Sequence, residues 1–272
     1  MEKSHFSYIF GATSYSNKDL FVPPLLKTVV ITGGASVGDC AFYGCSSLTS
    51  ITIPDTVKKI GDYAFEYCSA LMSITIPDSV TSIGNCAFSH CESLTSVVIG
   101  NGVTSIGFDA FSSCELLSSV VIGDNLKKID VGTFSFCSSL TSIEIPDSVT
   151  NIAYHAFYCC SSLTSVIIGD GVTSIGEGAF DGCLTLANIV IGDSLRSIGV
   201  NAFQSCRSLI SLTIPKSVII IDDSAFTWCS GLTDIIFEGT VEQWEAIMTS
   251  HTWNSGVPAT EVICSDGVVS LN

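Results

Sequence analysis

Cysteine, histidine and aspartate are the residues of this chain whose types and spacing could do chemistry. Nine of the thirteen cysteines recur at one unbroken interval of 23 residues: Cys45, Cys68, Cys91, Cys114, Cys137, Cys160, Cys183, Cys206 and Cys229. If each interval is one coil of a stacked structure, neighbouring Cβ atoms in this column lie about 4.8 Å apart, whereas a disulfide needs roughly 3.8 Å. The spacing therefore predicts a ladder of buried free thiols.

The other cysteines and the histidines form no recognisable reactive set. Cys40 and Cys86 share a second repeat position, but they are two coils apart, which is about 10 Å and too far to bridge. Cys159 and Cys264 have no mate at a repeat spacing. The four histidines, His5, His90, His155 and His251, have no recurring serine, cysteine or carboxylate partner. We therefore expect no catalytic residues, no cofactor and no enzyme activity.

Aspartates recur at another repeat position, directly after proline or glycine. The column comprises Asp55, Asp78, Asp124, Asp147, Asp170 and Asp193, with Asn101 and Lys216 interrupting it. Proline or glycine followed by aspartate is typical of a turn. A calcium site needs about six to eight convergent oxygens, whereas one carboxylate per coil forms a line. Turn formation is the favoured interpretation and a cation site the alternative, so no metal ligand is predicted.

The elements that must position these residues repeat with the same period. A phenylalanine marks each repeat, at positions 42, 65, 88, 111, 134, 157, 180, 203 and 226. Repeats of 20 to 50 residues at a fixed period are typical of solenoids, in which each coil buries its apolar face only against its neighbours. The sequence therefore predicts a solenoid, and extended repeat surfaces favour a role in binding.

One repeat shows how each coil is expected to fold. Ile143 and Ile145 alternate with Glu144, which indicates a strand with one buried face. Pro146 ends that strand, and a second short extended stretch follows. The segment 156–160 is expected to make one helical turn. Eight positions per coil should face inward: Leu140, Ile143, Ile145, Val149, Ile152, Ala156, Phe157 and Cys160.

The two ends of the chain depart from the repeat. We predict an N-terminal segment over 1–25, a repeat array over 26–237 that includes a divergent first coil, and a C-terminal cap over 238–272. In the first coil, the apolar residues of 26–31 lie one residue out of register with Val37 and Phe42, which implies a shortened turn. In the cap, Trp244 stands where Ile221 predicts an isoleucine, within an expected helix over 241–248, and a last strand is expected at 262–264.

Composition and charge argue against some classes of partner and location. The formal net charge is −16 with only 10 lysines and arginines, which argues against nucleic acid. Apolar runs are strand-sized, far below the roughly 18 residues of a membrane helix, so no membrane insertion is expected. The first 26 residues hold no apolar run of signal-peptide length, so we expect no export address in this chain.

The repeat Leu-x-x-Ile-x-Ile-Pro-x-x-Val-x-x-Ile-Gly-x-x-Ala-Phe-x-x-Cys resembles the BspA-type leucine-rich repeat over about 26–267, including a similar C-terminal cap at 239–244 and 263–267. The resemblance implies a leucine-rich-repeat solenoid: a right-handed, curved coil with parallel β-strands, one per repeat, lining one face. It also implies a surface-exposed or secreted protein of a host-associated microbe that binds host matrix proteins or other cells. The family offers no agreed ligand-binding residues to transfer.

We therefore expect a non-enzymatic, adhesin-like binding module for a protein or glycan on a host or neighbouring cell surface, such as an extracellular-matrix protein. The alternatives are a spacer that projects other domains and an intracellular scaffold. Two surfaces are candidates for partner binding. One surrounds the Ala-Phe turn: Tyr43, Tyr63, Tyr67, Phe108, Phe136, Tyr154, Tyr158 and Trp228. The other is an outward apolar stripe on the strands: Val98, Val121, Ile167 and Val190.

Overall fold

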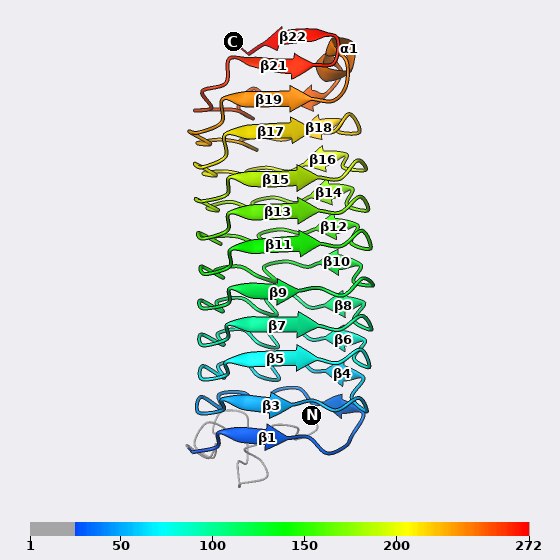
Figure 1. Cartoon of the computed structure of the whole chain (residues 1–272), viewed down its shortest axis with the longest axis vertical. Coiled ribbons are helices and arrows are strands. Elements are labelled where there is room, and N and C mark those ends of the chain that lie inside the picture. The colour runs from blue at the N-terminus through cyan, green and yellow to red at the C-terminus, as the bar shows by residue number, and fades with distance from the viewer. Residues whose placement is uncertain (1–24, 272) are drawn as a thin grey trace. The chain divides into compact units, whose positions relative to one another are not determined.

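The computed structural model describes residues 25–271. The chain divides into two compact units, one of residues 1–126 with 130–140 and the other of 127–129 with 141–272. Apart from residue 25, the predicted N-terminal segment lies outside the described residues. Within each unit, short strands stack coil upon coil in parallel (Figure 1). The predicted leucine-rich-repeat solenoid is thereby confirmed.

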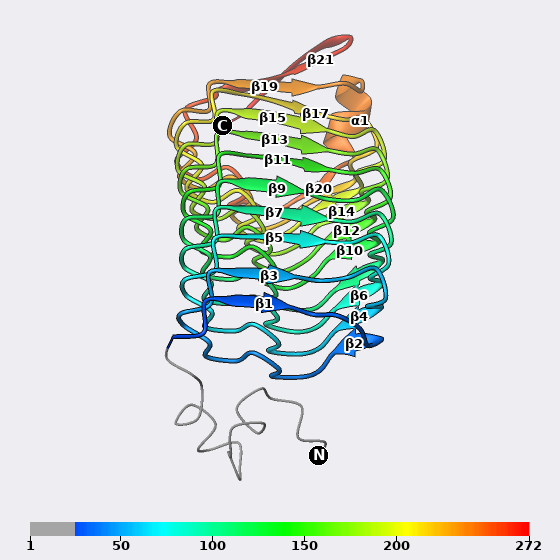
Figure 2. The ribbon, with the colours of Figure 1, turned by 60° about the horizontal axis from the view of Figure 1, so that its bottom comes forward.

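The first unit contains two kinds of strand in each coil. The longer strands pair as β1 with β3 and as β5-β7-β9, and the two-residue strands pair as β2-β4-β6-β8. Figure 2 shows the two sets on different sides of the coils. The bounds are β1 (Thr28–Val30), β2 (Ser36–Val37), β3 (Ser50–Thr52), β4 (Lys59–Ile60), β5 (Ser73–Ile76), β6 (Ser82–Ile83), β7 (Ser96–Ile99), β8 (Ser105–Ile106) and β9 (Ser119–Val121).

The second unit repeats this plan and adds a cap. Its sheets are ordered β11-β13-β15, β17-β19-β21-β22 and β10-β12-β14-β16-β18-β20. The bounds are β10 (Lys128–Ile129), β11 (Ser142–Ile145), β12 (Asn151–Ile152), β13 (Ser165–Ile168), β14 (Ser174–Ile175), β15 (Asn188–Ile191), β16 (Ser197–Ile198), β17 (Ser211–Ile214), β18 (Ile220–Ile221), β19 (Asp234–Phe237), α1 (Val241–Glu245), β20 (Met248–Thr249), β21 (Glu261–Cys264) and β22 (Gly267–Ser270).

The interior of each coil is the one that the repeat predicts. All eight inward positions from Leu140 to Cys160 are at most 3% exposed. The phenylalanine rings stack face to face, with centroids 5.0–5.5 Å apart from Phe42 to Phe134 and 5.1–5.4 Å apart from Phe157 to Phe226. This spacing follows the strand separation of about 4.8 Å, so ring stacking and strand pairing support each other.

The cysteine column is buried, and none of the thirteen cysteines forms a disulfide, as predicted. Each thiol from Cys68 to Cys137, and from Cys183 to Cys229, donates a hydrogen bond to the backbone carbonyl of the phenylalanine 26 residues earlier, over 3.0–3.4 Å. Burial raises the pKa of Cys68, Cys91, Cys114, Cys183 and Cys206, to about 12 at Cys114. The thiols of the ladder therefore link successive coils within each unit through hydrogen bonds.

The expected one-turn helix is wrong, and the hydrogen bonds explain why. Between 155 and 160 the backbone N–H groups alternate in direction. His155, Phe157 and Cys159 donate to carbonyls of the next coil, over 2.8–3.0 Å. The residues between them donate three positions back within their own coil. In an α-helix, all these N–H groups would donate to carbonyls four positions back in the same coil. Because half of them bond to the next coil, each coil turns this corner through consecutive turns instead.

Both divergent ends are partly as predicted. Val29 pairs with Ile51, an interval of 22 residues, which confirms the shortened first turn. The short helix is present as α1, and β21 follows β19 with Val262 opposite Ile235. Ile221, however, pairs with Thr249 and not with Trp244. Trp244 lies within α1, where it is buried against Phe237 and Trp253.

Candidate functional site

The corner around each repeating phenylalanine holds most of the predicted binding residues, and we call it the turn edge: the three residues before each phenylalanine and the two after it. Two positions of the turn edge have a positive φ in every described coil from 40 to 228. They lie two residues before and two residues after the phenylalanine. At Tyr67 and His155, for example, this conformation directs the N–H group to the next coil of the same unit, so it is a property of the stacked backbone and not of the side chain.

Three of the predicted aromatic residues occupy the second of these positions. Tyr67, Phe136 and Trp228 have φ values of 60°, 59° and 60° and are 42%, 47% and 60% exposed. The left-handed region costs roughly 1–2 kcal/mol for an L-residue other than glycine. The other coils have Gly44, His90, Ser113, Cys159, Gly182 and Ser205 at this position. The backbone conformation therefore favours glycine, and each exposed aromatic residue here carries the cost of a positive φ.

The other predicted aromatic residues lie at neighbouring positions of the turn edge. Phe108 and Tyr154, three residues before the phenylalanine, are exposed, whereas Tyr43, Tyr63 and Tyr158 are half-buried. Sequence reasoning places all of them on one edge, but only the structure separates the exposed rings from the rings that pack against the corner.

The structure brings some of these rings together and adds two histidines that sequence reasoning missed. In the first unit, Tyr67 stacks on His90 with centroids 4.7 Å apart and meets Tyr43 edge-on at 5.7 Å. In the second unit, His155 lies between Tyr154 and Tyr158, at 3.8 Å and 4.4 Å. The signal for the first histidine was available, because His90 follows Tyr67 by one 23-residue period.

Among the described residues, the group that most resembles a reactive site comprises His155, Cys159 and Asp181. The shifts in their pKa values oppose a nucleophilic role. Burial lowers the pKa of His155 and raises the pKa values of Asp181 and Cys159. The hydrogen bond with Cys159 makes the largest contribution to the raised pKa of Tyr158. A nucleophilic cysteine needs a lowered pKa. This group is therefore suited to packing and not to covalent chemistry.

In the first unit, Tyr63 lies at the same repeat position as Cys40 and Cys86, in the coil between theirs. The two cysteines are therefore two coils apart, as expected. The nearby Cys86, burial and two acidic side chains raise the pKa of Tyr63. Burial raises the pKa of Cys86 to about 12. Tyr63 and Cys86 therefore stay neutral and protonated near pH 7.

The apolar stripe on the strands is exposed, as predicted. Val98 pairs with Val121 on β7 and β9 and they are 42% and 53% exposed. Ile167 pairs with Val190 on β13 and β15 and they are 44% and 60% exposed. Sequence reasoning missed a further set, Ile236, Ile263 and Val268, on β19, β21 and β22. Ile236 continues the column of Val190 at the 23-residue interval, whereas Ile263 and Val268 lie in the cap, which abandons this period.

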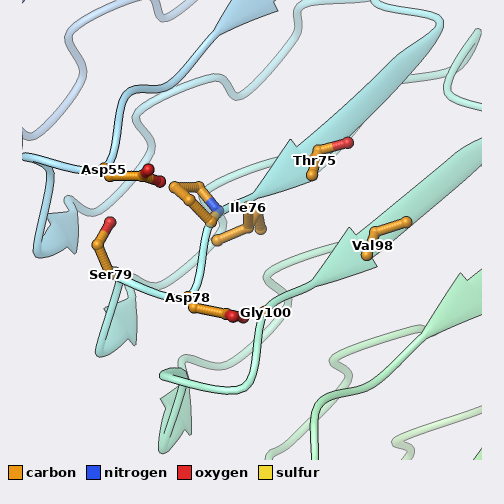
Figure 3. A pocket seen from close by; sticks show the side chains of 8 residues that line it. Asp55, Thr75, Ile76, Asp78, Ser79, Val98 and Gly100 are labelled. Atoms are coloured by element: carbon orange, nitrogen blue, oxygen red, sulfur yellow. The ribbon is translucent and has the colours of Figure 1, made fainter.

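The aspartate column uses its oxygens to join coils. The side chain of Asp78 accepts the backbone N–H of Asn101 over 2.7 Å, and that of Asp147 accepts the N–H of Asp170 over 2.8 Å. Asp55 and Asp78 also line an open hollow of about 510 Å³ beside Thr75 and Val98 (Figure 3). Among residues 25–271, no cluster of three or more histidine, cysteine or acidic side chains is arranged to hold a metal ion.

Comparison with known proteins agrees with the geometry. Residues 35–164 and 150–255 match the sequence profile of the BspA type leucine-rich repeat region. No curated protein matches the chain in sequence.

Solved structures give further likenesses. A leucine-rich repeat protein of T. pallidum is 29% identical over 64% of this chain and 82% of its own, with a TM-score of 0.57. A leucine-rich repeat protein of Bacteroides ovatus is 27% identical over 82% of this chain and 81% of its own, with a TM-score of 0.42. A leucine-rich cell surface protein of Faecalibacterium prausnitzii is 26% identical over 82% of this chain and 90% of its own, with a TM-score of 0.44.

The single described helix, α1, has five residues, and no helix in the described part of the chain has the length and apolar character needed to span a membrane.

Proposed function

Because the chain belongs to the BspA-type leucine-rich repeat family, we propose that it is a non-enzymatic, adhesin-like binding module. Its partner is a protein or a glycan on a host or neighbouring cell surface, an extracellular-matrix protein being one such class. The proposal includes a secreted or cell-surface location, in keeping with the family resemblance. The turn edge is the recognition surface.

One observation carries this proposal: Tyr67, Phe136 and Trp228 are exposed aromatic residues held at a positive φ. Their rings remain accessible to a partner, and the backbone of their position favours glycine. Aromatic side chains, above all tyrosine and tryptophan, contribute most of the energy in many binding interfaces. Selection for binding at the expense of stability would retain exposed aromatic residues at a destabilising backbone position such as this one.

The ring clusters support the same surface. Tyr67 is held in place by its stack on His90, so this ring loses little conformational freedom when a partner covers it. The stack of Tyr154, His155 and Tyr158 offers a similarly ordered surface in the second unit. Ordered aromatic rings favour binding because the cost of fixing side chains has already been met in the free protein.

The test is a binding screen of the folded chain against arrayed extracellular-matrix proteins and glycans. Beside it runs the triple variant Tyr67→Ser, Phe136→Ser and Trp228→Ser, which places at these positions the residue found at Ser113 and Ser205. We expect a partner in the screen, lost in the triple variant, while the midpoint of urea unfolding changes little because the three rings are exposed.

The matched control is Ser113→Gly with Ser205→Gly, which changes the same backbone position without removing a ring. This control should keep the binding. Full binding by the triple variant would move recognition away from these three aromatic residues. A native chain that binds nothing on the arrays would favour the spacer over the binding module.

A further inference from the structure

The C-terminal sheet of the second unit ends in an open edge. Within the described residues, β22 is the last strand of the order β17-β19-β21-β22 and pairs with β21 alone. Figure 1 shows β22 as the outermost strand of this sheet. Natural proteins commonly protect such edges with lysine, proline or a bulge. The four residues of β22 are Gly-Val-Val-Ser, which contain no charge and no proline.

The pairing of β22 shows which backbone groups face this edge. The N–H of Leu271 donates to the carbonyl of Thr260 over 2.7 Å, so that pair lies on the hydrogen-bonded side of the antiparallel ladder. Bonded and non-bonded pairs alternate along such a ladder. The N–H and C=O groups of Ser270 and Val268 therefore point away from β21, towards the open edge.

Helix α1 approaches only one end of this strand. A Cβ at Gly267 would lie 3.2 Å from Cγ2 of Val241, and Asp266 accepts the N–H of Val241 over 2.8 Å. Val268 is 54% exposed and Ser270 is exposed as well. The part of β22 that offers unpaired backbone groups is therefore accessible to another strand.

The outward face of the same sheet shows what that strand should carry. An apolar row crosses it, because Ile236 pairs with Ile263 and Ile263 pairs with Val268. A second row contains Asp234, Glu261 and Ser270, and both acidic side chains are exposed. The register of Ile235 with Val262 places Asp234 opposite Glu261. The two rows are thus apolar and acidic, side by side.

We propose that the edge of β22 binds an extended segment of a partner protein in which an apolar residue and a basic residue stand two positions apart, so that both side chains lie on the outward face. Backbone hydrogen bonds to Val268 and Ser270 add the segment to the sheet as a further strand. Its apolar side chain continues the row of Ile236, Ile263 and Val268. Its lysine or arginine side chain reaches across Ser270 towards the carboxylate of Glu261, which gives the interaction its charge complementarity.

This site is separate from the turn edge, so it stands or fails independently of the proposed function. The probe is a fluorescently labelled, end-blocked peptide with the sequence Thr-Val-Thr-Lys repeated twice, titrated with the full chain and followed by fluorescence anisotropy. In the matched peptide, glutamate replaces each lysine. We expect the lysine peptide to bind, more weakly at high salt, and the glutamate peptide to fail.

Two variants locate the site. Val268→Pro removes an N–H that faces the edge and leaves the pairing with β21, and should weaken binding at least about tenfold. Val268→Lys keeps the backbone and repels the basic peptide, so it tests the site even where the proline variant fails to fold. Thr52→Lys adds the same charge to an exposed strand position of the first unit and should bind like the native chain.

Three results would overturn the proposal. The first is no binding of the lysine peptide. The second is equal binding of that peptide by the native chain and by Val268→Lys. The third is equal binding of the lysine and glutamate peptides. The other possible occupant of the open edge is a second copy of this chain, and sedimentation of the chain alone tests for it. A dimer that Val268→Lys dissociates would show that a second copy of this chain fills the edge.

Discussion

The thiol of Cys183 donates a hydrogen bond to the backbone carbonyl of Phe157 over 3.3 Å. The two residues are 26 positions apart, so the bond joins one coil to the coil before it. Phe157 in turn stacks its ring on Phe180. The same carbonyl accepts the N–H of Cys160 over 3.2 Å, so the thiol supplies a second hydrogen bond from a side chain that also fills the core.

The first prediction concerns alkaline pH. Burial raises the pKa of the Cys114 thiol from 9.0 to about 12. The unfolded chain therefore loses this proton first, so the thiol's contribution to stability is complete below about pH 9 and falls as pH rises towards 12. The loss is about 1.4 kcal/mol per pH unit for each such thiol. Urea unfolding at several pH values between 8 and 11 measures it.

The control for this prediction is Cys114→Ala, which removes one titrating thiol. This variant should be less stable at pH 8 but should lose stability less steeply as the pH rises. Equal slopes for the two proteins would show that Cys114 does not titrate as a buried thiol.

The second prediction compares an inward and an outward residue of one coil. Leu140 is fully buried and Ser142 is exposed. Leu140→Ala should reduce the free energy of unfolding by about 2–5 kcal/mol because it leaves a cavity, whereas Ser142→Ala should change it by less than about 0.5 kcal/mol. Chemical denaturation of both variants checks the assignment, which similar losses would refute.

The third prediction separates the two interpretations of the aspartate column. The side chain of Asp147 accepts the N–H of Asp170, and Asn101 accepts the N–H of Asp124 in the same way over 3.0 Å. Asp147→Asn should therefore keep the native stability, while Asp147→Ala should lose about 0.5–1.5 kcal/mol with the hydrogen bond. A rise in the unfolding temperature with millimolar calcium, abolished in Asp147→Asn, would instead support a cation site.

The fourth prediction concerns the contact between Gly178 and His155. Gly178 has a φ of +58°, and a Cβ at this position would overlap the imidazole of His155. Gly178→Ala should cost about 1 kcal/mol for the backbone conformation alone, and more for the displaced ring. In a double-mutant cycle, His155→Ala should remove the cost of the displaced ring and leave the cost of the backbone conformation. Additive losses would mean that the ring moves aside freely.

Much of this fold could be read from the sequence because the period leaves little choice. A strict repeat of 23 residues fixes the register, so each residue type keeps its position in every coil. The inward positions, the phenylalanine and cysteine columns, the strands and the outward valines and isoleucines followed from that register alone. Even the shortened first turn was visible, as a single residue missing between Val29 and Ile51.

The candidate site was predicted less completely. Sequence reasoning gathered the aromatic residues on one edge because their positions vary between coils. It could not show that Tyr67 stacks on His90, or that His155 lies between two tyrosines, because ring orientation depends on the backbone of the corner. It also aligned Trp244 with Ile221, since the cap offers no repeat from which to count.

The sequence by itself determined that this protein is a stack of equivalent coils, because apolar residues at a fixed period can be buried only against their neighbours. Only the tertiary structure decided how each coil turns its corner. There the N–H groups of alternate residues bond to the next coil, and this prevents a helix and sets a positive φ at Tyr67 and Trp228. Such bonds join residues that are far apart in sequence, so no local pattern specifies them.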